Sequence, residues 1–337
     1  MLVCCLVGNI SAASAAGKKK EKVVVAYVTS WSDVIPDPKY MTHINYAFGA
    51  VNKTFDGVDV SNPDRLRMVV NLKKKAQKLK VLLSIGGWGS GRFSEMAADS
   101  LLRRSFAEDC QRVVEYYGLD GIDIDWEYPT SNAAGISSSP DDTRNFTKLM
   151  RDIRAAIGED KLLTLATVHN ANFIDFHAIL PYINFVNIMT YDMGNPPYLH
   201  SALYESPNTN GNTTDAGVRA HLAAGVPPSM IVVGMPFYGR GKTPFRSFVD
   251  YGKMDVLPEA FTQKWDDKAM VPYIIDAEGR LVLGFENARS LKIKCDYVIE
   301  KGLRGAMYWD YAGDDDKNTL RSVVADNMLG KAGKNRR

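Results

Sequence analysis

The stretch LDGIDIDWEYP, residues 119–129, decides how this sequence folds. Successive side chains of a β-strand point to opposite faces of the sheet. Asp123, Asp125 and Glu127 therefore share one face of the predicted strand, and the apolar residues between them share the other. The apolar face predicts packing under a layer of helices, and Pro129 ends the strand. The acidic face has to point into a polar space, because unpaired buried carboxylates are costly.

The row of three acids favours a reactive site over a solvated surface. Because neighbouring carboxyl groups cannot all ionise, the pKa of at least one rises, and a carboxyl that stays protonated can act as an acid. A surface strand or a cation site is the alternative interpretation. The apolar residues between the acids argue against it, since they require burial. Glu127 would also lie at the C-terminal end of its strand, where parallel barrels carry their chemistry.

Short apolar runs alternate with helical segments along the chain. The eight predicted strands are residues 23–28, 43–48, 81–87, 119–129, 162–168, 185–192, 230–238 and 305–309. The predicted helices include residues 64–79, 100–117, 141–157, 214–224 and 287–301, with Asp141 and Asp142 expected to cap the third of these. This alternation implies parallel pairing and favours a (β/α)8 TIM barrel. A doubly wound open sheet fits less well, because no Gly-rich phosphate turn follows the first strand.

We assign residues 17–240 together with 286–330 to the α/β barrel, and residues 241–285 to a small α+β insertion. The insertion has two short β-like runs, 271–275 and 280–283, around a hairpin-type turn. The long polar loops 130–140 and 194–212 are expected to shape a binding groove. By strand parity, Trp126 should pack on the outside of the barrel, and Asp120 should be structural. Residues 331–337 form a basic tail.

Composition and charge indicate an ordinary globular protein. The chain has 337 residues and a formal net charge of +2, which gives no case for nucleic acid as a partner. No stretch after the N-terminus is long and apolar enough to span a bilayer. Without a Cys/His cluster of zinc-site spacing, we expect no metal and no cofactor. We also expect a monomer with Cys110 and Cys295 as free, buried thiols.

Residues 1–16 are small and apolar, and they offer an A-x-A-like cleavage site before Gly17. This pattern predicts a secretory signal and a secreted or periplasmic protein. The basic start of such a signal is missing, so a truncated or atypical signal stays open. Cys4 and Cys5 also leave lipoprotein anchoring open.

The spacing D-x-x-D-x-D-x-E at residues 120–127 resembles the signature of family 18 glycoside hydrolases, the chitinases and their relatives. Four further motifs match in order along nearly the whole chain: SIGGW at 84–88, MTYD at 189–192, MPFYGR at 235–240 and GAMYWD at 305–310. Asp310 stands where the last motif usually has Glu. The insertion resembles a shortened form of the one in subfamily A chitinases.

The resemblance implies substrate-assisted catalysis, in which the 2-acetamido oxygen of the sugar is the nucleophile. Glu127 would be the general acid and then the base, Asp125 would bind the acetamido N–H, and Asp123 would hold a proton that Asp125 exchanges with it. The resemblance also implies that Tyr27 and Ser84 support Asp123 and that Tyr191 donates to the acetamido oxygen. Asp192, Met189 and Trp309 would contact the sugar, with Trp309 beneath it. The residues expected to line neighbouring subsites are Trp88, Trp31 and Arg240. The resemblance also implies non-proline cis peptides at Ala47–Phe48, Glu127–Tyr128 and Trp309–Asp310.

The expected function is that of a retaining, endo-acting chitinase that cleaves β-1,4 bonds between N-acetylglucosamine units. The short insertion predicts a shallow groove, which favours endo action. An endo-β-N-acetylglucosaminidase or a cell-wall glycan hydrolase of the same family is the alternative. A non-catalytic chitin-binding lectin is a third hypothesis, against which the presence of Glu127 argues.

Overall fold

The computed structural model describes residues 21–254 and 259–330. The expected signal segment 1–16 and the basic tail 331–337 lie outside these ranges. No helix within them is long and apolar enough to cross a membrane.

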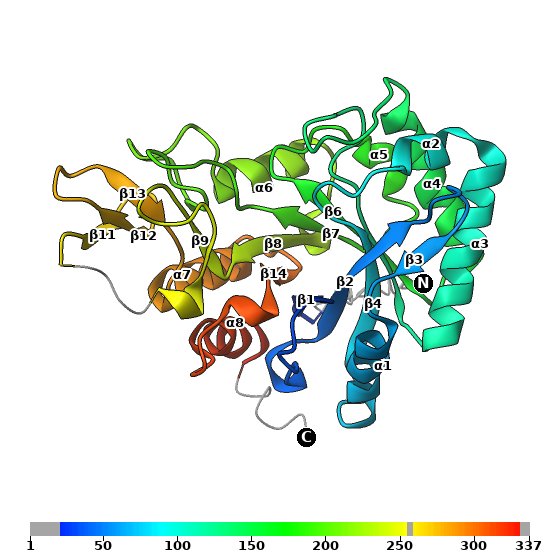
Figure 1. Cartoon of the computed structure of the whole chain (residues 1–337), viewed down its shortest axis with the longest axis horizontal. Helices are drawn as coiled ribbons and strands as arrows, with labels where there is room; N and C mark the ends of the chain where they lie inside the picture. Colours follow the sequence, from blue (N-terminus) through cyan, green and yellow to red (C-terminus); the bar gives the residue numbers. More distant parts are fainter. Residues whose placement is uncertain (1–20, 255–258, 331–337) are drawn as a thin grey trace, which may run out of the picture.

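Eight parallel strands close into a barrel, which confirms the predicted (β/α)8 fold (Figure 1). Neighbouring strands pair in the order β1-β14-β8-β7-β6-β5-β4-β2, and β1 pairs with β2 to close the ring. An additional strand, β3 (Val58–Val60), runs antiparallel to β2. The barrel strands are β1 (Val23–Thr29), β2 (His43–Val51), β4 (Lys80–Gly86), β5 (Gly121–Asp125), β6 (Leu162–Val168), β7 (Phe185–Met189), β8 (Ile231–Pro236) and β14 (Gly305–Trp309).

The helices that surround the barrel differ from the prediction in number and length. They are α1 (Pro63–Asn71), α2 (Phe93–Ala98), α3 (Ser100–Tyr117), α4 (Asp142–Ile157), α5 (Phe176–Ile179), α6 (Thr214–Ala223), α7 (Ala288–Glu300) and α8 (Thr319–Leu329). The predicted helix 64–79 was too long, because α1 gives way to a 3-10 turn at Leu72–Lys74. No side chain from Asn71 to Lys78 is buried, so no packing supports further helix there.

Two details of the predicted elements were wrong. The fourth strand ends at Asp125, before Glu127, which therefore lies just beyond it. Asp141 makes no capping hydrogen bond with its side chain. Asp142 is fully buried instead and accepts hydrogen bonds from the Ser139 and Thr130 backbone N–H groups, so it holds the loop between them rather than a helix end.

The outer face of β5 packs against the helices as strand parity predicts. Trp126 is 2% exposed and stacks on Phe93 of α2, with ring centroids 5.2 Å apart. The ring of Phe146 of α4 is tilted against Trp126, with ring centroids 6.1 Å apart. Cys110 and Cys295 are free and buried, as predicted. The apolar layer between sheet and helices thus fixes the orientation in which the acids face inward.

A second, antiparallel sheet adjoins the barrel, at the left of Figure 1. Its order is β10-β9-β13-β12-β11. The only described helical piece between residues 241 and 285 is a 3-10 turn, Tyr251–Lys253. The strands are β9 (Tyr238–Gly241), β10 (Val249–Asp250), β11 (Thr262–Asp266), β12 (Val271–Ile275) and β13 (Leu281–Gly284). The sheet begins at Tyr238, one residue beyond the end of β8.

A buried ion pair ties this region together. Glu286, which follows β13, pairs with Lys294 of α7, and both side chains are fully buried. Lys294 also donates to the carbonyl oxygen of Ser201, whose hydroxyl donates to Glu286 at 2.7 Å. The pair thus joins α7 to the long loop between β7 and α6.

We predict that Lys294→Met lowers the free energy of unfolding by about 3–5 kcal/mol, because Glu286 would stay buried without its partner. Lys292→Met is the matched control on the same helix. Lys292 and Asp296 pair with both side chains more than half exposed, so we expect a loss below about 1 kcal/mol. Urea unfolding followed by circular dichroism measures both variants. Equal losses would contradict the importance of the buried pair.

Candidate active site

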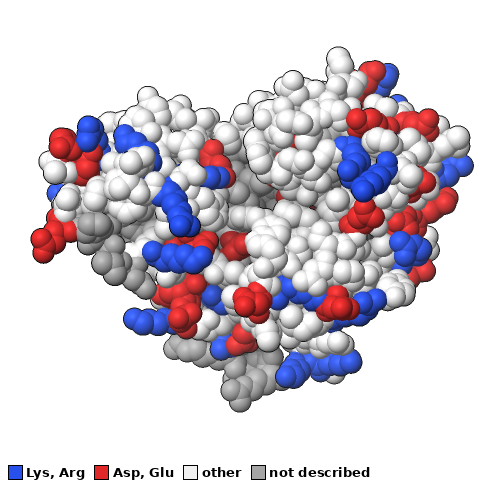
Figure 2. Space-filling view, in the orientation of Figure 1, with Lys and Arg blue, Asp and Glu red and all other residues white. Residues whose placement is uncertain are grey.

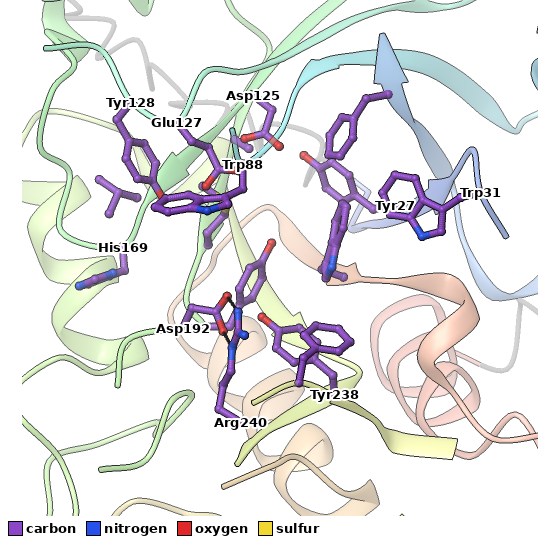
Figure 3. A pocket seen from close by; sticks show the side chains of 17 residues that line it. Tyr27, Trp31, Trp88, Asp125, Glu127, Tyr128, His169, Asp192, Tyr238 and Arg240 are labelled. Carbon is purple, nitrogen blue, oxygen red and sulfur yellow. Dashed lines mark hydrogen bonds and ion pairs between the residues drawn. The ribbon is translucent and has the colours of Figure 1, made fainter. Parts of the chain in front are cut away.

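A cavity of about 650 Å³ opens at the C-terminal ends of the barrel strands. It corresponds to the hollow near the centre of the face in Figure 2, and Figure 3 shows its side chains. Ten of the twelve predicted site residues line it: Tyr27, Trp31, Trp88, Asp125, Glu127, Met189, Tyr191, Asp192, Arg240 and Trp309. Asp123 and Ser84 are fully buried and do not line the cavity.

Asp123 is held by four side-chain donors. The hydroxyls of Tyr27 and Ser84 each donate to Oδ2 at 2.8 Å. Oδ1 accepts from the Thr164 hydroxyl at 2.5 Å and from the Asn187 amide at 3.3 Å. Burial raises the pKa of Asp123, and the four hydrogen bonds oppose that rise.

Sequence reasoning missed Thr164 and Asn187. Both are polar residues inside apolar strands, a signal that could have revealed them. Ser84 and Thr164 are also the register partners of Asp123 on the two neighbouring strands, β4 and β6. The barrel register therefore assembles this cluster from residues that are far apart in sequence.

Asp125 has the opposite environment. Its Oδ1 is buried without a hydrogen-bond partner among the described residues. Burial, followed by the charges of Glu127 and Asp123, raises its pKa well above the usual range. Because Asp123 has four donors and this oxygen of Asp125 has none, the surroundings stabilise the charged form of Asp123 better than that of Asp125. The proton-holding role that the resemblance implies for Asp123 stays a prediction.

Glu127 is partly buried at the cavity. Burial raises its pKa to about 7, hydrogen bonding by Tyr128 opposes the rise, and the charge of Asp192 adds to it. At neutral pH this carboxyl is therefore poised between its acid and base forms, as general acid–base chemistry requires.

Aromatic rings form the floor and walls of the cavity. Trp309 stacks on Phe48, with ring centroids 5.5 Å apart, and lies 6.4 Å from Trp31. Trp88 meets Tyr128 edge-on at 6.4 Å, and Tyr128 stacks on Phe173 at 5.5 Å. Such flat apolar surfaces suit the faces of pyranose rings.

Asp192 and Arg240 form a two-pronged ion pair at the cavity (Figure 3). The Arg240 Nε–Asp192 Oδ1 and Nη2–Oδ2 distances are both 2.5 Å. The guanidinium also lies over the rings of Tyr238 and Phe248, 5.4 Å from each centroid. Burial opposes ionisation of Asp192, but its contacts with Arg240 and His200 hold the pKa of this carboxyl below its usual range.

Several cavity residues were not predicted from the sequence: Phe48, Tyr128, Ala166, Val168, His169, Tyr238 and Phe248. Most of them lie at or just after the C-terminal ends of barrel strands, and this position could have identified them in the sequence. Phe248 comes from the region of the second sheet, where no sequence pattern pointed to a cavity residue. The described residues contain no group of three or more His, Cys, Asp or Glu side chains suited to a metal ion.

The three non-proline cis peptides implied by the resemblance are all present, at Ala47–Phe48, Glu127–Tyr128 and Trp309–Asp310.

Comparison with known proteins agrees with these motifs. The family profile "Glycosyl hydrolases family 18" matches residues 23–314. Chitinase A1 of Niallia circulans is 31% identical, in a match that covers 81% of this chain and 46% of that protein. Chitinase B of Serratia marcescens is 26% identical, in a match that covers 87% of this chain and 78% of that protein. The chain thus spans about half the length of the first relative.

Solved structures show the same architecture. A family 18 N-acetylglucosaminidase from Paenibacillus barengoltzii superposes with a TM-score of 0.83 at 31% identity, over 91% of this chain and 100% of the other. A chitinase from Bacillus thuringiensis gives a TM-score of 0.85 at 26% identity, over 92% of this chain and 70% of the other. With the profile matching most of its length, the chain belongs to the family 18 glycosyl hydrolases.

Proposed function

We propose that the chain hydrolyses β-1,4 bonds between N-acetylglucosamine units of chitin and chito-oligosaccharides, with retention of configuration. The family and its chitinase-named relatives support the substrate class. The observation that carries the proposal is that Glu127, whose pKa burial raises to about 7, and Asp125, whose pKa is also raised, both line one aromatic cavity.

Glu127 supplies the proton. In its acid form it protonates the glycosidic oxygen as the bond breaks, and the resulting carboxylate then activates water. Its raised pKa keeps a large fraction protonated near neutral pH. The carboxyl therefore serves both steps without leaving the cavity.

Asp125 and Tyr191 act on the acetamido group. The carboxyl group of Asp125, which lines the cavity, accepts the amide N–H, which turns the carbonyl oxygen toward the anomeric carbon, while Tyr191 donates to that oxygen. The positive charge that develops on the sugar is stabilised by the neighbouring carboxylates. Asp123 stays anchored below by its four donors and sets the charge of Asp125.

The aromatic surfaces favour binding of several sugar units and hence endo action. Trp309 forms the floor beneath the cleaved unit. Trp31 and Trp88 are 66% and 64% exposed and lie apart across the cavity (Figure 3), where they extend the platform beyond one ring. Because a polymer of this kind lies outside the cell, we propose secretion, which the apolar residues 1–16 support.

Release of single N-acetylglucosamine units is the second candidate. The observation that favours it is the solved N-acetylglucosaminidase, whose whole chain this protein covers at 31% identity. The two candidates share the acid set and differ in the number of sugar units bound.

We predict that Glu127→Gln lowers kcat on chito-oligosaccharides by about 10²–10⁴-fold, because the amide cannot donate the proton. Glu108→Gln, on the exposed face of α3, is the matched control and should leave the rate unchanged. Release of reducing ends measures both. Full activity of the Glu127 variant would exclude it as the acid.

We predict that chito-hexaose yields mixed dimer, trimer and tetramer from the earliest time points, with the β-anomer formed first. Chromatography gives the chain lengths, and NMR of the nascent products gives the anomer. Monosaccharide as the dominant first product would favour the second candidate. An α-anomer would rule out retention.

We predict that kcat/KM falls as the pH rises above about 7, because the proton on Glu127 is lost there. The negative charge of Asp192 raises the pKa of Glu127, so Asp192→Asn should move this alkaline limb to lower pH. Asp141→Asn, an exposed surface change, is the control. A limb that stays in place in the Asp192 variant would show that its charge does not act on Glu127.

A further inference from the structure

His200 is a buried polar side chain that the proposed reaction does not use. It lies in the long loop between β7 and α6, is 1% exposed, and is not among the cavity-lining residues. Neither ring nitrogen has a hydrogen-bond partner among the described residues. Nδ1 lies 3.6 Å from Oδ1 of Asp192, and the imidazole packs against Tyr238, with ring centroids 5.3 Å apart.

The surroundings of the two nitrogens decide which one carries the proton. Nδ1 faces the Asp192 carboxylate, whereas Nε2 faces no acceptor among the described residues. A buried N–H without an acceptor is costlier than an unused acceptor lone pair. The nitrogen that carries a proton toward Asp192 is therefore Nδ1. The 3.6 Å separation of Nδ1 and Oδ1 is an electrostatic contact, longer than a hydrogen bond.

We propose that His200 is a positioning residue that holds the Asp192 carboxylate in one orientation at the cavity rim. Arg240 holds the same carboxylate from the cavity side, so Asp192 is fixed between a guanidinium and an imidazole. An effect of His200 on catalysis rests on the proposed function, whereas the contact between His200 and Asp192 does not.

Arg240 alone is a weaker anchor than this pair. The side chains of Asp192 and Arg240 are 40% and 26% exposed, and partly exposed ion pairs lose much of their energy to solvent and side-chain entropy. An arginine at a cavity wall can also turn toward a sugar. His200 has no such freedom, because it is buried behind the carboxylate.

The backbone that carries His200 is fixed independently of the cavity. The carbonyl oxygen of His200 accepts from Met193 N–H at 3.0 Å. The next residue, Ser201, contacts both members of the buried Glu286–Lys294 pair. Among the described residues, the contacts of this region join the ring to Asp192, which Arg240 also holds, and to Tyr238, and they join the next residue to the Glu286–Lys294 pair.

Histidine-selective ¹⁵N NMR on the full chain tests the contact without any turnover. The chain has five histidines, so the His200 signal is the one lost in His200→Phe or His200→Asn. We expect the Nδ1–H tautomer in the wild type, and a changed Nδ1 shift in Asp192→Ala. His221 is the internal control, since its Nδ1 contacts the Gly217 carbonyl oxygen at 2.8 Å and its signal should not move. An Nε2–H tautomer of His200 would overturn the proposal.

A double-mutant cycle on chito-tetraose tests the consequence. His200→Phe keeps a flat ring against Tyr238 but removes the donor, and we expect kcat/KM to fall about 10-fold, the scale of a lost orienting partner. His200→Asn keeps an N–H near the position of Nδ1 and should retain activity within about 3-fold of the wild type. In an Asp192→Ala background, His200→Phe should cost less than about 2-fold, because the group it acts through is gone.

His221→Phe is the matched control, since His221 is equally buried but packs against Phe176, away from Asp192. It should lower stability without changing kcat/KM in either background. Equal losses from His200→Phe with and without Asp192 would reduce His200 to a packing role and overturn the proposal. If chito-oligosaccharides prove not to be substrates, the proposed function fails, while the NMR result still decides the contact.

Discussion

The structure depends on one buried carboxyl group, that of Asp123. Its four hydrogen bonds come from side chains on β1, β4, β6 and β7, so five of the eight barrel strands meet at a single group. A buried carboxyl without such partners would strongly destabilise the fold. The same strand cannot be turned over, because Trp126 and its apolar neighbours pack under the helices. The contacts that close the barrel are therefore the same contacts that hold the acids in place.

From that anchor, the environment of the acids changes stepwise along the chain. Asp123 is surrounded by donors, Asp125 has one oxygen without a partner, and Glu127 reaches the cavity. Burial raises the pKa of all three, well above the usual range for Asp125 and to about 7 for Glu127. Each step of two residues along the backbone thus gives the same functional group a different proton affinity, a common arrangement in acid–base sites.

Local pattern in the sequence was enough to predict two features of the fold. The alternation of apolar and acidic residues predicted which face of β5 points inward, and the succession of apolar segments predicted the barrel. Contacts made by closure could not be predicted in this way, such as Thr164 beside Asp123 or Phe248 beside Arg240. Asp142 was also misassigned, because its position before an apolar run suggested a cap, although its carboxylate binds the preceding loop. Packing partners decided these cases, and local pattern does not reveal them.

The junction between the two sheets limits how the cavity can move. A single residue, Phe237, separates β8 from β9, and both of its backbone groups are hydrogen-bonded, to Trp309 and to Tyr251. Tyr238 and Arg240, which come next in the chain, are therefore mechanically continuous with the barrel. A hinged swing of the smaller sheet over the opening would have to break those bonds. A long glycan would thus bind in a groove whose shape is already set before binding, and no closure of the smaller sheet would be needed.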